Sequence, residues 1–227
     1  MLTGLPKITT KIVSNSCYMF MFDGCTSLKS IPNNYLPTPN EVKNNMYMNM
    51  FQNCTGLTTL PSNLITFNPY RTQGSYLCYR MFQNCTGLTT LPSNLLPATT
   101  LTDSCYNGMF KGCTRLTTIP KLPATTLTGS CYYDMFNGCS SLVEIPKGWY
   151  LPAQTIKNKS CYNMFRECSK LQKMAVAYSG TIAASNWEYF LLNVSKTGTF
   201  YYSKNQTKEN IKSIVPSGWT LVQSTAW

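Results

Sequence analysis

The side chains with the most reactive chemistry in this sequence are eleven cysteines and eight carboxylates, and the chain has no histidine. A cysteine nucleophile needs a neighbouring base that lowers its pKa, and no base accompanies the cysteines at a fixed spacing. A zinc site needs clustered ligands such as a Cys-x-x-Cys pair, which the sequence lacks. The carboxylates are scattered, whereas a glycosidase needs two that face each other. We therefore expect no enzyme, no catalytic residue, no metal site and no cofactor.

The spacing of the cysteines bears on disulfides. Cys105 and Cys113 are eight positions apart, which on a helix separates them by about 12 Å, too far for a disulfide. Met46 stands where the second copy of the pattern should carry its first cysteine, so Cys54 has no such partner. Methionine suits a slot that needs apolar volume. These observations favour buried free thiols stacked in two ladders, while a disulfide between neighbouring copies, such as Cys105 to Cys131, stays open.

One phrase recurs six times along the chain, with the form Cys-Tyr-x-x-Met-Phe-x-x-Cys-x-x-Leu-x-x-Ile/Leu-Pro. Its Met-Phe pairs are Met21-Phe22, Met50-Phe51, Met81-Phe82, Met109-Phe110, Met135-Phe136 and Met164-Phe165. The steps between them are 29, 31, 28, 26 and 29 residues. Repeats of this length are typical of solenoids, in which each unit buries its apolar face against its neighbours.

Each unit predicts a short helix followed by a short strand. Ser or Asn before the first cysteine position, such as Ser104, suits a helix N-cap. Gly or Asn before the second cysteine, such as Gly112, suits a left-handed residue at the end of about two helical turns. A strand then follows, as in 57–60, and proline closes it, as at Pro61. The predicted fold class is an α/β repeat solenoid, a leucine-rich-repeat-like stack with a small C-terminal cap.

The repeats divide the chain into two parts. Residues 1–175 form the predicted solenoid, a partial first unit and six repeats, and residues 176–227 form a C-terminal capping segment. In the latter, residues 185–188 fit a capping box that opens a helix through Leu192, and 198–202 and 219–223 are predicted strands. The first residues resemble the middle of a repeat, which favours a fragment of a longer protein. No apolar stretch is long enough to cross a bilayer.

The repeated phrase resembles the BspA-like leucine-rich repeats of bacterial surface proteins, whose phrase is close to Ala-Phe-x-x-Cys-x-x-Leu-x-x-Ile with a proline just after. The resemblance covers residues 2–175, with Met in place of Ala before Phe. It implies a surface-exposed solenoid that binds other macromolecules, often as an adhesin, and it implies no enzymatic activity. A fold transfers between relatives more readily than a ligand does.

The chain is basic, with nineteen Lys and Arg against eight Asp and Glu, a formal net charge of +11. A cluster straddles the last repeat, formed by Lys157, Lys159, Arg166, Lys170 and Lys173. It suits a patch for acidic glycans or nucleic acid. No nucleic-acid motif accompanies the charge, and a solvated surface that keeps the protein soluble is the plainer interpretation.

Threonine pairs recur on the predicted strands. They are Thr58 and Thr59, Thr89 and Thr90, and Thr117 and Thr118. A flat threonine ladder can bind ice or carbohydrate, but it more often reflects β-propensity on an exposed strand. The other copies break the column, which disfavours an ice lattice and favours a shaped macromolecular contact. These threonines and the basic cluster are the candidate ligand-contact residues.

The sequence thus predicts a non-enzymatic binding or adhesion protein at a bacterial cell surface or secreted, recognising a matrix protein, glycan or bacterial surface component. The alternative is a phage tail-fibre module or an intracellular partner-binding module on the same scaffold. Unpaired cysteines fit that alternative, because a reducing compartment keeps thiols reduced. No specific nucleic-acid partner is expected.

Overall fold

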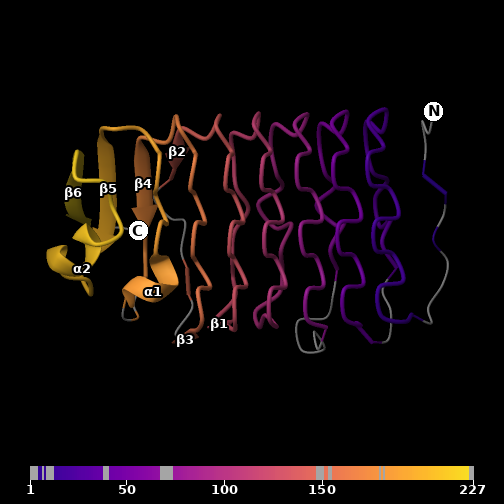
Figure 1. Cartoon of the computed structure of the whole chain (residues 1–227), viewed down its shortest axis with the longest axis horizontal. Coiled ribbons are helices and arrows are strands. Elements are labelled where there is room, and N and C mark those ends of the chain that lie inside the picture. Colours follow the sequence, from indigo (N-terminus) through magenta and orange to yellow (C-terminus); the bar gives the residue numbers. More distant parts are fainter. Residues whose placement is uncertain are drawn as a thin grey trace.

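The computed structural model describes residues 5–6, 8, 13–37, 41–66, 74–146, 151–152, 155–178, 180 and 182–224. The chain winds into coils that lie side by side along one axis, with the N-terminal end and the β5–β6 end at opposite ends of the stack (Figure 1). Coils 1 to 6 each contain one Met-Phe pair. The named elements are β1 (Thr126–Leu127), β2 (Glu144–Ile145), β3 (Thr155–Ile156), β4 (Lys173–Val176), α1 (Ala184–Trp187), β5 (Gly198–Ser203), α2 (Lys208–Lys212) and β6 (Trp219–Ser224).

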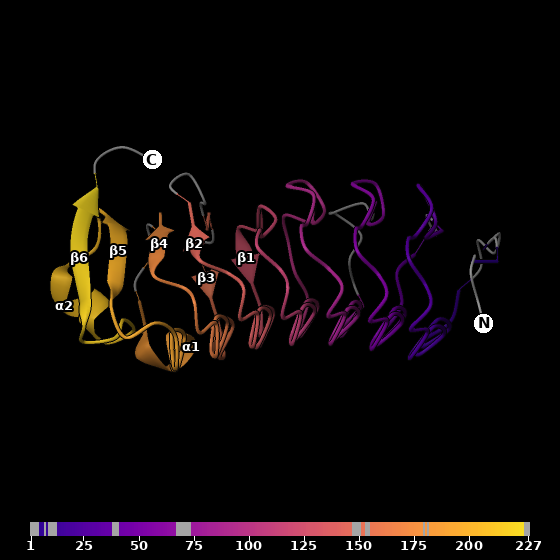
Figure 2. The same ribbon diagram turned by 90° about the horizontal axis from the view of Figure 1, so that it is seen from above.

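The short helices predicted around the Met-Phe pairs are absent from the described residues of coils 1 to 6, and consecutive turns take their place. We call these stretches the turn segments: residues 16–25, 45–54, 76–85, 104–113, 130–139 and 159–168. Figure 2 shows them as one row along the lower edge of the stack, in line with α1. The first, fifth and ninth residue of every turn segment has positive φ, from 51° to 77°. A positive φ every four residues prevents an α-helix.

The turn segments are held by two alternating sets of backbone hydrogen bonds. Within coil 4, the N–H groups of Asn107 and Met109 donate to carbonyls three residues earlier, at 3.2 Å each. The intervening N–H groups of Gly108 and Phe110 donate instead to the next coil, to Tyr133 O at 2.8 Å and Met135 O at 3.0 Å. A two-turn helix would leave most of its terminal N–H and C=O groups unpaired. In the turn segments these N–H and C=O groups bond to the next coil instead, which favours the turns over a short helix.

Glycine and asparagine make these turns possible. Of the eighteen residues with positive φ in the six turn segments, four are Gly, five are Asn and one is Asp. These residue types tolerate the left-handed region best. The left-handed residue predicted before each second cysteine is confirmed at Gly24, Asn53, Asn84, Gly112 and Gly138. The predicted N-cap serines do not cap helices: Ser16, Ser104 and Ser130 themselves have positive φ.

The core runs through the stack as columns of identical side chains. The six Phe residues of the Met-Phe pairs stack ring on ring, with centroids 5.3–5.7 Å apart. The Met before each Phe is fully buried in coils 2 to 6, whereas Met21 in coil 1 is 45% exposed. Each coil therefore buries the apolar face of its neighbour. Among the described residues that precede coil 1, Leu5, Ile8 and Val13 are partly buried against this core.

Two parallel sheets complete the stack. One pairs β1 with β3, and the other has the order β2-β4-β5-β6. The strands predicted at 198–202 and 219–223 match β5 and β6 to within one residue, and these strands extend the sheet of the coils. The predicted capping box is wrong: α1 begins at Ala184 after Ala183, which makes no side-chain cap bond, and it ends at Trp187. The short helix α2 follows the N-cap Thr207 and was not predicted.

The coils approach so closely at Gly87 that a side chain there would collide with backbone. A Cβ on Gly87 would lie 2.4 Å from Thr55 O and 2.7 Å from Leu57 O. We expect Gly87→Ala to lower the free energy of unfolding by about 1–3 kcal/mol, because neighbouring coils must separate. Urea unfolding measures the change. Arg115→Ala is the control, since exposed Arg115 holds the equivalent position in coil 4; equal effects of the two substitutions would contradict the close approach.

Candidate functional site

The six candidate threonines lie on the strand side of coils 2 to 4, and all except the half-buried Thr89 are exposed. Their backbones are joined by hydrogen bonds: Thr89 N donates to Thr58 O at 3.3 Å, and Thr117 N donates to Thr89 O at 2.8 Å. The strand predicted at 57–60 is wrong, because these positions of coils 2 to 4 form connections and not strands. The buried Leu57 and Leu60 flank the exposed pair Thr58 and Thr59.

Several threonine hydroxyls are used inside the stack. Thr117 Oγ1 donates to Thr89 O at 2.9 Å, and Thr118 Oγ1 accepts a hydrogen bond from Leu91 N at 3.0 Å. Thr58 Oγ1 makes a longer bond of 3.5 Å to Lys29 O. The hydroxyls of Thr58 and Thr117 donate to carbonyls that also accept the N–H of the same threonine, whereas the hydroxyl of Thr118 takes the place of a backbone acceptor for Leu91. Within the described residues, Thr59 and Thr90 offer hydroxyls that bond to no neighbour, so only part of this face is available to a ligand.

A polar groove of about 440 Å³ occupies the equivalent positions of coils 5 and 6 and the start of β5. It is lined by Val143, Glu144, Gln172, Lys173, Thr197, Gly198 and Thr199. Glu144 and Lys173 face each other in register across β2 and β4, and their charged atoms are 2.8 Å apart. The hydrogen bond from Lys173 to the Glu144 carboxylate raises the pKa of Lys173. Among the described residues, Glu144 and Lys173 are the only charged ones that line this groove, so its lining has no net charge.

The five basic residues of the last repeat do not act as one uniform patch. Lys159 lies at the start of the turn segment of coil 6, with Nζ 5.2 Å above the ring of Tyr162. Arg166 lies near the other end of that segment and pairs with Glu167 at 3.4 Å. Lys173 is in β4, paired with Glu144. Lys157 and Lys170 are exposed on the connections between these elements.

The sequence analysis did not predict a row of tyrosines on the outer side of the turn segments. The rings of Tyr133 and Tyr162 stack with centroids 5.0 Å apart and an interplanar angle of 7°. Tyr189 meets Tyr162 edge-on at 5.4 Å and is 46% exposed. Arg80 lies over the ring of Tyr79, with Cζ 4.8 Å from its centroid. We call Tyr79, Arg80, Tyr133, Tyr162 and Tyr189 the tyrosine ridge.

Gly108 makes the ridge continuous across coil 4. Arg80 Cγ lies 3.0 Å from where a Cβ of Gly108 would be, so the arginine side chain extends over this residue. The charges of Arg80 and Arg166 act on Tyr133, but burial and Asp134 outweigh them and raise the pKa of Tyr133. Asp134 pairs with Lys111 Nζ at 2.6 Å. Among the described residues, no carboxylate forms an ion pair with Arg80 or Lys159, although burial and the charge of Glu188 raise the pKa of Tyr162.

A shift of one residue explains why the ridge was missed. The backbone bonds align the coils by their Met-Phe pairs, and coils 3 and 6 have one residue fewer between Cys-Tyr and Met-Phe than coil 4 has. In coil 4, the buried position three residues before the Met of the Met-Phe pair holds Tyr106. In coils 3 and 6 the same buried position holds Cys78 and Cys161, so Tyr79 and Tyr162 take the next position, which is less buried. The shortened spacer was the signal in the sequence that turns these tyrosines outward.

The same shift corrects the two predicted thiol ladders. The first ladder is not continuous, because Cys78 and Cys161 lie in a column whose other members are tyrosines, Tyr18, Tyr47, Tyr106 and Tyr132. The second is continuous, and each thiol from coil 2 onward donates to the Phe carbonyl of the preceding coil, as Cys113 Sγ does to Phe82 O at 3.2 Å. Burial raises the pKa of Cys54 and Cys113 to about 12. A buried thiol with a raised pKa is a poor nucleophile.

All eleven cysteines are free in the structure. In the described part of the chain, no group of three or more Cys, Asp or Glu residues is arranged to hold a metal ion. Neither α1 nor α2 is long and apolar enough to span a bilayer, and no other helix occurs in the ranges described. No family model, curated protein or solved structure matches this chain.

Proposed function

We propose that this chain is a non-enzymatic binding protein, a leucine-rich-repeat-like solenoid that attaches to another macromolecule through the tyrosine ridge. The observation that supports this most directly is the contact of the half-buried Tyr133 and Tyr162 with the exposed Tyr189. Arg80 and Lys159, which form no ion pair with any described carboxylate, lie over the rings of Tyr79 and Tyr162. Tyrosine and arginine are the residue types most enriched at the energetic centres of protein interfaces. The ridge supplies both on a rigid row of coils.

The geometry of the ridge favours binding in a second way. Tyr133 and Tyr162 already restrain each other by stacking, so little side-chain entropy remains to be lost when a partner docks. The positive charge of Arg80 and Lys159, within a chain of net charge +11, favours an acidic partner. The repeat resemblance makes a bacterial cell surface the proposed setting and adhesion the proposed role. A phage fibre or an intracellular binding module remains the alternative setting.

Binding to immobilised matrix proteins, sulfated glycans and bacterial cells at low and high salt tests the proposal. We expect saturable binding to one of these targets that survives high salt, and a loss of at least tenfold in affinity for Tyr162→Ala, since one interfacial tyrosine contributes roughly 1.4 kcal/mol or more. The matched control is the double variant Thr59→Ala with Thr90→Ala, which changes the threonine face alone. A loss of binding in the control but not in Tyr162→Ala would assign the contact to the strand side. If the protein bound all acidic surfaces and this binding disappeared at high salt, the net charge of the chain would explain it and the proposal would be contradicted.

A further inference from the structure

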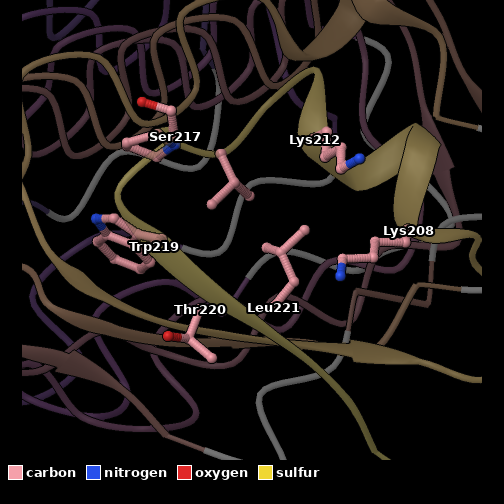
Figure 3. Close-up of a pocket in the computed structure, with 8 residues that line it drawn as sticks. Lys208, Lys212, Ser217, Trp219, Thr220 and Leu221 are labelled. Carbon is pink, nitrogen blue, oxygen red and sulfur yellow. The ribbon is translucent and has the colours of Figure 1, made fainter.

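A pocket of about 520 Å³ lies at the C-terminal end of the sheet, between α2 and β6. Figure 3 shows Lys208 and Lys212 of α2 on one side of it, and Trp219, Thr220 and Leu221 of β6 on the other. Val215, Pro216 and Ser217 of the connection between these elements complete the lining.

The floor of this pocket is the open end of the hydrophobic core. Met174, Phe200 and Leu221 are partners in register across β4, β5 and β6, so their side chains share one face of the sheet. Met174 and Phe200 are fully buried, whereas Leu221 is only partly buried. Within the described residues, no further strand covers Leu221. An apolar side chain placed beside it would continue this column.

The backbone of β6 is open on the same side. The sheet order β2-β4-β5-β6 leaves β6 paired with β5 alone among the strands of the described chain. β6 has six residues, and an edge strand presents N–H and C=O groups that an added strand can pair with. The pocket thus lies directly beside an available edge.

The rim of the pocket is basic. Lys212 Nζ forms an exposed ion pair with Glu209 at 3.1 Å. Lys208 has no carboxylate partner within the described residues, and its amino group points toward the pocket in Figure 3. An anionic group on a ligand would therefore find a free ammonium group here.

We propose that β6 and this pocket form a docking site for an extended acidic peptide, distinct from the tyrosine ridge. The peptide adds as a strand beside β6, places one large apolar side chain on Leu221 and brings a carboxylate to Lys208. Main-chain bonds give such complexes affinity, and alternate side chains give specificity.

Calorimetric titration with four capped heptapeptides tests this site. The first is acetyl-Thr-Glu-Thr-Phe-Thr-Glu-Thr-amide, in which Phe and both Glu share one face of a strand. The others replace Glu by Lys, replace Phe by Ala, or carry N-methyl groups on alternate peptide nitrogens. We expect the first peptide to bind and each of the others to bind at least tenfold more weakly. Equal binding of the N-methylated or Lys peptide, or no binding of the first at about 1 mM, which corresponds to roughly −4 kcal/mol, would overturn the proposal.

Two protein variants with the same charge change locate the site. Lys208→Glu should weaken binding of the first peptide at least fivefold, whereas Lys204→Glu, which lies outside the pocket lining, should change it less than twofold. Both are surface substitutions on exposed lysines, and matching thermal midpoints verify the fold. Equal losses of peptide affinity in the two variants would mean that the peptide is attracted by net charge alone, and this would contradict the proposed site. Tyr162→Ala should leave peptide binding unchanged, so this test stands or fails separately from the ridge.

Discussion

The protein is expected to unfold cooperatively near pH 10, while remaining stable at pH 8. The reason is the set of nine buried thiols at Cys54, Cys78, Cys85, Cys105, Cys113, Cys131, Cys139, Cys161 and Cys168. In the unfolded chain a cysteine ionises with a pKa of about 9, whereas burial raises the pKa of each of these thiols in the folded chain, to about 11 for Cys131 and about 12 for Cys113.

The sign follows from proton binding. Between the unfolded and folded pKa values, the unfolded chain has released protons that the folded chain retains, so the free energy of unfolding falls as pH rises. Well below pH 9 both states are protonated and the stabilisation is fully present. Between pH 9 and pH 10 each thiol costs about 1 kcal/mol, and nine together cost about 9 kcal/mol, comparable to the whole stability of an ordinary domain.

Urea titrations at pH 7, 8, 9 and 10 measure this dependence. Cys78→Met is the matched variant, because Met46 already serves as an apolar replacement for a cysteine in coil 2, and it should make the decline between pH 9 and 10 shallower by about 1 kcal/mol. Cys17→Ala, at an exposed position, should alter the decline less. A free energy of unfolding that stays constant from pH 8 to pH 10 would show that these thiols are not buried in the folded protein.

Phe110→Ala should be the most destabilising single substitution in the aromatic column, with a cost of about 3–5 kcal/mol in the free energy of unfolding. Phe110 is fully buried and stacks on Phe82 and Phe136, each 5.7 Å away. Its removal leaves a cavity and interrupts the contact between coils on both sides, and a stack depends on contacts between nearest neighbours.

Phe22→Ala provides the comparison at the end of the column. Phe22 stacks on Phe51 of the next coil at 5.3 Å and is 5% exposed. We expect its replacement to cost less than that of Phe110 and to leave coils 3 to 6 folded. Chemical denaturation followed by far-UV circular dichroism distinguishes the two. Equal losses for both variants would indicate that the stack unfolds as one unit without regard to position.

The tandem organisation and much of the core were predictable from the sequence. Six Met-Phe pairs at 26 to 31 residues dictate that each unit packs on copies of itself, and the structure stacks the phenylalanines in that order. The left-handed residue before each second cysteine also followed from local chemistry, since Gly and Asn tolerate positive φ. So did β5 and β6, which are rich in β-branched and aromatic residues that favour strands.

The conformation of the turn segments could not be predicted from local patterns. Stretches such as 104–113 carry the caps and apolar residues of a short helix, yet half of their N–H groups donate to the next coil. Propensity within one unit does not include this second partner. The capping box at 185–188 failed for the same reason: the backbone carbonyls of Asn186 and Glu188 accept hydrogen bonds from coil 6.

By itself, the sequence determined the number of coils, their apolar columns and the excess of positive charge. Only the tertiary structure decided which tyrosines face outward, because a single missing residue before Met-Phe moves Tyr79 and Tyr162 from the buried column to the surface. It also decided that part of the threonine face is used internally, and that Leu221 ends an open core beside an unpaired strand edge. Each of these depends on the register between coils or strands, which is set by hydrogen bonds between residues more than twenty positions apart.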